Sequence, residues 1–260
     1  MSTQEAVLVS TRDARGVVTL TLNRPAQFNA LSEALMTELQ RALDAIAGDR
    51  SVCVVVLAAS GKAFCAGHDL KEMRATPSTD YYQRLFQQCA RLMLSLQQLP
   101  VPVIARVHGT ATAAGCQLVA TCDLAVAASN ARFAVSGVNL GLFCSTPAVA
   151  LSRNLGRKAA FEMLVTGDFI NADQALNEGL INRVVASEAL DAEVERLVAS
   201  IVAKPRVAVA LGKALFYRQL ETGIAAAYAD AAQTMACNMM DESALEGVQA
   251  FIEKRPPHWR

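Results

Sequence analysis

Two glycine-containing segments of this chain have residue types suited to holding a negatively charged oxygen. In GKAFCAGHDLKEM, Gly67 permits a tight turn, and His68 with Asp69 begins a helical segment. In HGTATAAGCQL, small residues lead to a helix start at Ala114. The first N–H groups of a helix have no partner within it, and the helix dipole favours negative charge there. Two such groups converging on one point would stabilise an oxyanion.

The second segment lacks a side chain that can act as a base. Its first candidate is Gln117, and an amide does not take up a proton at neutral pH. Glu72 belongs to the helix of the first segment, and we interpret Asp123 as a structural cap or turn acid. The sequence therefore combines an oxyanion-binding arrangement with the absence of an obvious base.

Strands and helices that alternate along the chain must position these segments. VVTLTLNRP alternates like a half-buried strand, and Ser32 caps a helix with apolar residues at helical spacing. VCVVVLAAS is a continuous apolar run, typical of a strand covered on both faces. Two further cycles join a helix over 79–98 to a strand over 103–107, and a helix over 114–122 to a strand over 124–128.

The later part of the chain has a different character. From about Arg157 onward the pattern is mainly helical, and Pro205 separates one helical stretch from the next. We expect an α/β core over residues 1–195 and a helical C-terminal part over residues 196–260.

Composition excludes several classes of function. The 24 Lys and Arg balance the 24 Asp and Glu and are scattered, so no face for nucleic acid is indicated. No apolar run approaches the roughly 18 residues that a membrane span needs. The first sixteen residues have neither the apolar core of a secretion signal nor an Arg-rich run, so we expect a cytoplasmic protein. The seven cysteines show no CxxC spacing, which favours reduced thiols and no metal site.

Several segments together resemble the enoyl-CoA hydratase/isomerase (crotonase) superfamily, in order and over nearly the whole chain. They are LNRPAQFNAL, GKAFCAGHDLKEM, PVIARVHGTATAAGCQLVATCDLAVA, FAVSGVNLGL, LVTGDFINADQALNEGLINRVV and AFIEKR. The resemblance implies a spiral of ββα units and a C-terminal helical part that builds trimers or hexamers. It implies coenzyme A as part of a thioester substrate and no permanently bound cofactor. Within the superfamily, GCQLVATCD, GVNLGLFCSTP and LGKALFYRQL resemble the enoyl-CoA hydratase domain-containing protein 3 group.

The resemblance also implies roles for single residues. The oxyanion N–H groups of the family fall on His68 and Ala114. The two glutamates of its hydratases fall on Gln117 and on Gly137, which has no side chain. Cys144 lies downstream of the second position, and its thiol is either a proton donor or a core residue. The side chain of His68 either faces the acyl chain or points to solvent.

The nucleotide of coenzyme A would meet three parts of the chain. The family's contacting segments fall on PAQF and AGHD, and a neighbouring subunit's C-terminal helix would supply an aromatic residue and a lysine. The charges of two further cations suit phosphate, although each also fits an ordinary solvated position. The candidates are Arg24, Ala26, Phe28, Lys62, Ala66, Asp69, Phe251 and Lys254.

Three functions remain open from the sequence. A conventional enoyl-CoA hydratase would need another base. A malonyl-type decarboxylase would need only the enolate site and a proton donor. AGHDL and VNLGLF resemble the methylmalonyl-CoA decarboxylase branch. That branch, however, has Glu where this chain has Gln117 and Tyr where this chain has Cys144. A non-catalytic protein would hold acyl-CoA without turnover. We favour a protein that binds an acyl-CoA thioester and polarises its carbonyl or stabilises its enolate.

Overall fold

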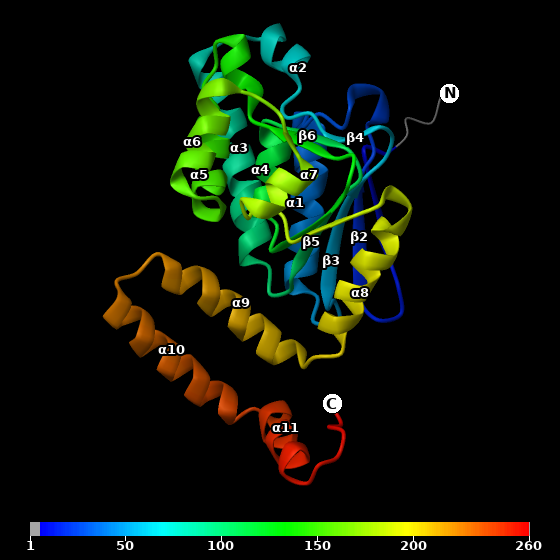
Figure 1. Cartoon of the computed structure of the whole chain (residues 1–260), viewed down its shortest axis with the longest axis vertical. Coiled ribbons are helices and arrows are strands. Elements are labelled where there is room, and N and C mark those ends of the chain that lie inside the picture. Colours follow the sequence, from blue (N-terminus) through cyan, green and yellow to red (C-terminus); the bar gives the residue numbers. More distant parts are fainter. Residues whose placement is uncertain (1–5, 260) are drawn as a thin grey trace.

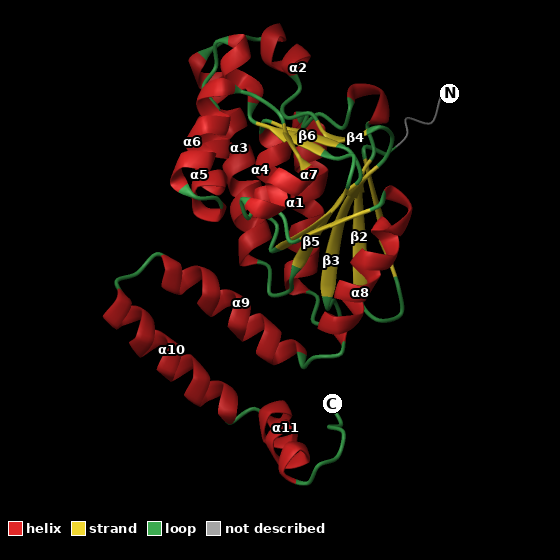
Figure 2. Cartoon of the chain, in the orientation of Figure 1, coloured by secondary structure: helices red, strands yellow, loops and turns green. Residues whose placement is uncertain are grey.

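The computed structural model describes residues 6–259, which form two β-sheets surrounded by helices (Figures 1 and 2). The larger sheet has six strands, in the order β1 (Leu8–Arg12), β2 (Val17–Leu22), β3 (Val54–Ala59), β5 (Val103–Val107), β7 (Leu124–Ala128) and β10 (Arg183–Val185). The smaller sheet has four, in the order β4 (Ala63–Cys65), β6 (Thr110–Thr112), β8 (Arg132–Ala134) and β9 (Ile170–Asn171).

Successive strands alternate between the two sheets. β3, β5 and β7 are parallel neighbours in the larger sheet, and each is followed by a strand of the smaller sheet, β4, β6 and β8 in turn. Helices connect one pair of strands to the next, so the chain forms the predicted spiral of ββα units. The helices of this part are α1 (Glu33–Gly48), α2 (Leu70–Ala75), α3 (Thr79–Gln98), α4 (Ala114–Thr121), α5 (Ser145–Asn154), α6 (Arg157–Thr166), α7 (Ala172–Asn177) and α8 (Leu190–Val202).

The larger sheet is covered on both faces, as the apolar run of β3 predicts. All six residues of β3 are buried. Val55 and Leu57 face the core formed with α1 and α3, whereas Val54 and Val56 pack against α8. Helix α1 begins as predicted, since the Ser32 hydroxyl accepts a hydrogen bond of 3.1 Å from the Leu35 N–H.

Three helices extend from this core as an arm: α9 (Arg206–Leu220), α10 (Ile224–Met239) and α11 (Glu242–Ile252) (Figure 1). Apart from the Lys213 side chain, the residues of α9 and α10 are half-buried or exposed. The expected division between residues 195 and 196 falls inside α8, because Leu197 and Val198 of this helix are buried against the sheet. The chain leaves the core only after α8.

A buried ion pair joins the arm to the core. The Lys213 ammonium on α9 donates to the Asp123 carboxylate at 2.7 Å and to the carbonyls of Leu96 and Val101. The Tyr217 hydroxyl donates to the other oxygen of Asp123 at 2.8 Å. The Lys213 side chain is only 6% exposed, and burial lowers its pKa against the opposing effect of Asp123. Asp123 therefore has a structural role, in agreement with the sequence interpretation.

Within residues 6–259, no helix has both the length and the apolar character needed to cross a membrane. All seven cysteines, which lie in this range, are free thiols.

Candidate active site

The two glycine-containing segments meet at one edge of the smaller sheet. β4 ends at Cys65 and β6 ends at Thr112, and the two strands are parallel neighbours. The carboxyl ends of parallel strands lie at the same edge of a sheet, so the segments that follow them are brought together. This pairing places the segment with His68 beside the segment with Ala114, and the convergence of their N–H groups stays a prediction.

A parallel β-bridge between Leu31 and His68 sets the direction of the His68 backbone N–H. The Leu31 N–H donates to the Gly67 carbonyl at 2.7 Å, and the Asp69 N–H donates to the Leu31 carbonyl at 3.2 Å. In a parallel bridge the residue between these two partners directs its own N–H and C=O away from the bridging residue. The His68 N–H therefore points away from Leu31.

Two glycines allow the segments to approach closely. A methyl group on Gly67 would lie 3.3 Å from the Ala114 nitrogen and 2.9 Å from the Ala113 Cβ, and Gly67 has a φ of +93°. A methyl group on Gly115 would lie 2.1 Å from the Cys65 carbonyl oxygen. Because side chains at either position would separate the segments, these glycines bring the Gly67–His68 peptide against the start of α4.

Backbone strain at Ala113 sets the direction of the Ala114 N–H. Ala113 has φ +49° and ψ −120°, which is unfavourable for a residue with a Cβ. As the first residue of α4, Ala114 has no helical acceptor for its N–H, and the first helical bond runs from the Gln117 N–H to the Ala113 carbonyl. The geometry can thus present two backbone donors, from His68 and Ala114, to one oxygen.

The side chain of His68 is turned into the protein. Both ring nitrogens are buried without a hydrogen-bond partner among the described residues. The ring meets Phe86 of α3 edge-on, with 5.5 Å between the ring centroids. Burial lowers the pKa of His68 to about 4, so the imidazole is neutral at pH 7.

Gln117 lies one turn along α4 from Ala114. It is 4% exposed, and its Oε1 atom is buried without a hydrogen-bond partner in residues 6–259. The amide is therefore directed into the interior at the site and is not engaged in structural bonds through this oxygen.

The structure shows why position 137 has no side chain. A methyl group on Gly137 would lie 2.5 Å from the Leu142 carbonyl oxygen and 2.7 Å from the Cys144 Sγ. Burial raises the pKa of Cys144, which keeps this thiol protonated at neutral pH. The thiol also contributes to the raised pKa of its neighbour Cys116 on α4, for which burial is the main cause. Cys144 and the 137–142 turn occupy the space in which a glutamate at 137 would begin.

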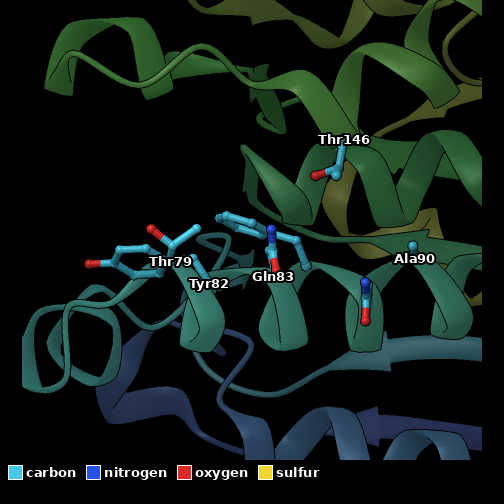
Figure 3. Close-up of a pocket in the computed structure, with 7 residues that line it drawn as sticks. Thr79, Tyr82, Gln83, Ala90 and Thr146 are labelled. Atoms are coloured by element: carbon cyan, nitrogen blue, oxygen red, sulfur yellow. The ribbon is translucent and has the colours of Figure 1, made fainter.

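A groove of about 490 Å³ lies beside this site, between α3 and the start of α5 (Figure 3). Phe86 lines the groove and also contacts the His68 ring, so the groove lies next to that side chain. The groove was not foreseen from the sequence, because α3 and α5 are more than forty residues apart and no local pattern indicates that they meet. Its lining residues are Thr79, Tyr82, Gln83, Phe86, Gln87, Ala90 and Thr146.

The first two candidate segments for coenzyme A are joined by hydrogen bonds. The Ala66 N–H donates to the Phe28 carbonyl at 3.0 Å. The Arg24 guanidinium, expected as a phosphate partner, donates to Asp69 at 2.9 Å, and both side chains are less than one-fifth exposed. Arg24 thus holds the loop carrying His68.

Asn29 is a residue of these loops that sequence reasoning missed. It is fully buried with φ +53°, and its side-chain amide donates to the carbonyls of Ser60 and Ala63.

The remaining candidates lie at the surface. Ala26 and Lys62 are exposed near these loops. Phe251 is 85% exposed near the end of α11, and Lys254 follows it with φ +56°. Within this chain α11 lies in the arm, away from the loops that carry His68 and Ala114 (Figure 1). The structure therefore joins Arg24, Phe28, Ala66 and Asp69 in one set of loops and leaves Phe251 and Lys254 in the C-terminal part of the chain, so their shared role in binding coenzyme A stays a prediction.

Comparison with known proteins identifies the family. The model of the enoyl-CoA hydratase/isomerase family matches residues 12–260. Mouse enoyl-CoA hydratase domain-containing protein 3, mitochondrial, is 46% identical over 258 residues, covering 99% of this chain and 86% of the relative. The chain therefore belongs to the enoyl-CoA hydratase/isomerase family, with the crotonase fold.

Two solved structures are closely similar to this chain. A Mycobacterium smegmatis enoyl-CoA hydratase superposes with a TM-score of 0.98 at 71% identity, covering 98% of this chain and 99% of the other. Human enoyl-CoA hydratase domain-containing protein 3 superposes with a TM-score of 0.94 at 43% identity, covering 97% and 100%. The predicted resemblance to the domain-containing protein 3 group is confirmed.

One prediction is contradicted by these comparisons. The chain was expected to be cytoplasmic, whereas the related mouse and human proteins are named as mitochondrial. The expectation rested only on the absence of targeting features in the first sixteen residues, and such an absence carries no positive signal for a compartment.

Proposed function

We propose that this protein binds an acyl-CoA thioester and polarises its carbonyl between the backbone N–H groups of His68 and Ala114. The apposition of the Gly67–His68 peptide with the start of α4 is the observation that carries this proposal. The same donors would stabilise the thioester enolate, in which the oxygen becomes negatively charged. Loss of one such donor typically costs about 2.7–4 kcal/mol of transition-state stabilisation.

Conventional hydration is not the reaction that this site supports. Gln117 carries an amide, and the Cys144 thiol stands against Gly137 where a second acid would begin. General acid and base groups each typically contribute about 10²- to 10⁴-fold to a rate. The function we favour is therefore thioester binding with carbonyl polarisation or enolate stabilisation, without the two-carboxylate hydration chemistry.

Coenzyme A would lie along the loops tied together by Arg24, Phe28, Ala66 and Asp69. Its nucleotide would be completed by Phe251 and Lys254 of a second copy of the chain. The arm supports such an assembly, because large apolar side chains lie exposed along it and exposed patches of this kind mark protein contacts. These side chains include Phe216, Leu220, Ile224, Tyr228, Met235 and Met240. The assembly we propose is a homotrimer or a hexamer built from two trimers.

Binding and turnover are tested separately. Calorimetry with acetyl-CoA, crotonyl-CoA and free coenzyme A measures whether the thioester adds affinity to the nucleotide. Mass spectrometry of enoyl-, hydroxyacyl- and malonyl-type thioesters incubated with the protein then reports any product. Failure of every thioester and of coenzyme A to bind at millimolar concentration would contradict the proposal.

A further inference from the structure

Lys254 has a backbone conformation that is unfavourable for every residue with a side chain. Its φ is +56°, in the left-handed region. Within residues 6–259, the other residues besides glycine with a positive φ are Phe28, Asn29 and Ala113, all in the loops of the candidate active site. Such a conformation persists only where surrounding contacts impose it, and it is concentrated at functional sites. The contacts around Lys254 therefore need a reason.

The backbone around Lys254 ends helix α11. The Arg255 N–H donates to the Ala250 carbonyl at 3.0 Å, and the Lys254 N–H donates to the Phe251 carbonyl at 3.2 Å. Helices commonly end in this way, and the residue in the left-handed position is then usually glycine. This chain has a lysine in that position, so the turn, and not the helix, sets the direction in which the lysine side chain leaves the backbone.

Glu246 holds the residue that follows Lys254. The Arg255 Nη1 donates to the Glu246 Oε1 at 2.6 Å, and the Arg255 Nη2 donates to the Glu246 Oε2 at 3.0 Å. Two parallel bonds between a guanidinium and a carboxylate fix their relative orientation, which a single bond does not. The hydrogen bonds from Arg255 lower the pKa of Glu246 to about 2, so the carboxylate is charged at neutral pH.

The end of the chain is bound to the same carboxylate. The His258 N–H donates to the Glu246 Oε1 at 2.8 Å. The Trp259 Nε1 donates at 3.0 Å to the carbonyl of Ala203, the residue that follows α8. Gly247 leaves room for the indole, since a methyl group there would lie 3.1 Å from the ring. The chain thus returns to the start of the arm, and the turn after α11 is held on both sides (Figure 1).

We infer that Glu246 is a positioning residue for the binding of coenzyme A. By holding Arg255, it keeps Lys254 in its left-handed conformation and directs the ammonium toward the phosphates of a nucleotide bound by a neighbouring copy. A turn without this pair would have to become ordered when the ligand binds, at a cost in affinity. The inference rests on the proposed function, in which Lys254 of a second copy completes the nucleotide site.

Calorimetry with coenzyme A on Glu246→Gln measures the effect. Glutamine has a similar shape but no longer offers two acceptor oxygens to the two donors of Arg255. Affinity should fall about 2- to 13-fold, the ratio for ordering one flexible side chain on binding. Arg255→Lys, which keeps the charge without the paired donors, should show a similar loss. Asp230→Asn is the control, because it breaks the ion pair of Asp230 with Arg218 in the same arm and should leave affinity unchanged.

Combination with arm variants separates positioning from a general structural role. In the Lys254→Ala background, Glu246→Gln should weaken binding by less than about 2-fold, because the side chain that it positions is gone. In the Phe251→Ala background, Glu246→Gln should keep its full effect. Equal effects in the two backgrounds, or unchanged affinity in both Glu246→Gln and Arg255→Lys, would overturn the inference.

Two substitutions of Lys254 test the backbone conformation. Lys254→Gly and Lys254→Ala both remove the ammonium, so both should weaken coenzyme A binding by the same factor. Glycine adopts the left-handed conformation freely, so Lys254→Gly should melt about 2–8 °C higher than Lys254→Ala. Equal melting temperatures would show that the contacts do not impose a strained conformation and would overturn the inference.

Failure of the proposed function gives a different result. If Lys254→Ala, Lys254→Gly and Phe251→Ala all bind coenzyme A as tightly as the unmodified protein, the nucleotide site shared between copies is wrong, and the role of Glu246 is wrong with it. If these variants lose affinity while Glu246→Gln and Arg255→Lys do not, the shared site stands and only the positioning role is refuted.

Discussion

A methyl group added at Gly137 should destabilise the protein. The added carbon would lie 2.5 Å from the Leu142 carbonyl oxygen and 2.7 Å from the Cys144 Sγ, both too close for a real contact. The Leu142 N–H also donates to the Gly137 carbonyl at 3.0 Å, so the first of these neighbours belongs to a closed backbone turn. Overpacking of this kind typically costs about 1–3 kcal/mol.

Thermal unfolding followed by circular dichroism measures this cost. Proteins of about 150–250 residues lose roughly 2–4 °C in Tm for each kcal/mol, so Gly137→Ala should melt about 2–12 °C lower. Gly48→Ala is the control, because a methyl group there meets nothing within 4 Å. Adding Cys144→Ala to Gly137→Ala should recover only part of the loss, since it removes the sulfur contact and leaves the Leu142 carbonyl in place.

The consequence for chemistry follows from the same contacts. Restoring two carboxylates with Gln117→Glu and Gly137→Glu should not produce a hydratase, because the second side chain cannot enter without moving the 137–142 turn. If Gly137→Ala proved as stable as Gly48→Ala, the turn would yield easily and this steric explanation would be refuted.

Four further predictions concern other parts of the molecule. The unmodified protein should hydrate crotonyl-CoA at least about 10²-fold more slowly than a typical enzyme turns over its substrate. Lys213→Met removes the cation beside the Asp123 carboxylate, which keeps its hydrogen bond from Tyr217, and should lower the free energy of unfolding in urea by about 3–5 kcal/mol. His68 has its pKa lowered from its ordinary 6.5 to about 4, so wild-type stability relative to His68→Phe should fall as pH drops from 6.5 to 4, by about 3 kcal/mol in total. Phe251→Ala and Lys254→Ala should each weaken coenzyme A binding measured by calorimetry.

Each of these four predictions has a control or a result that would contradict it. Hydration of crotonyl-CoA as fast as ordinary enzymatic turnover would show that another base acts in the site. The control for Lys213→Met is Arg153→Met, which breaks the ion pair of Arg153 with Glu221; both side chains are more than half exposed, so stability should change by less than about 1 kcal/mol. If Lys213→Met changed stability no more than this control, the stabilising role of the buried ion pair would be refuted. Parallel pH curves for wild type and His68→Phe would show that His68 is not buried neutral. Unchanged affinity in both arm variants would exclude a site shared between subunits.

The sequence was sufficient for the fold because its signals there are local and periodic. The strand over Val103–Val107 and the helix over Thr79–Gln98 have the predicted bounds, since apolar spacing and the flanking breaks define them. The small residues after two strands also correspond to a close approach in the structure, where Gly67 lies against the start of α4. Resemblance over the full chain to a known family reinforced both.

Other features depend on contacts between distant residues and left no local signal. The Cys144 thiol against Gly137, the groove between α3 and α5, and the binding of Lys213 to Asp123 each join elements that local patterns do not connect. Asn29 is a partial exception, because asparagine tolerates a positive φ and its place in the FNAL turn could have indicated such a conformation. The position where the arm separates was misplaced because the apolar face of α8 resembles that of any surface helix.

The central claim is that backbone N–H groups polarise a thioester carbonyl, and the vibration of that carbonyl reports on it directly. Infrared difference spectra with butyryl-CoA labelled with ¹³C at the thioester carbonyl isolate the stretching band of the bound ligand. In the wild-type complex this band should move to lower frequency than in water. Ala114→Pro removes one donor and should reverse most of the shift. Replacement of Ala114 by lactic acid should do the same, because it exchanges the backbone N–H for an ester oxygen and does not introduce the proline ring. Arg157→Pro, at the first position of α6, should leave the shift intact because it leaves the two donors in place. A bound carbonyl with its solution frequency, or an undiminished shift in the folded lactic-acid variant, would contradict the account.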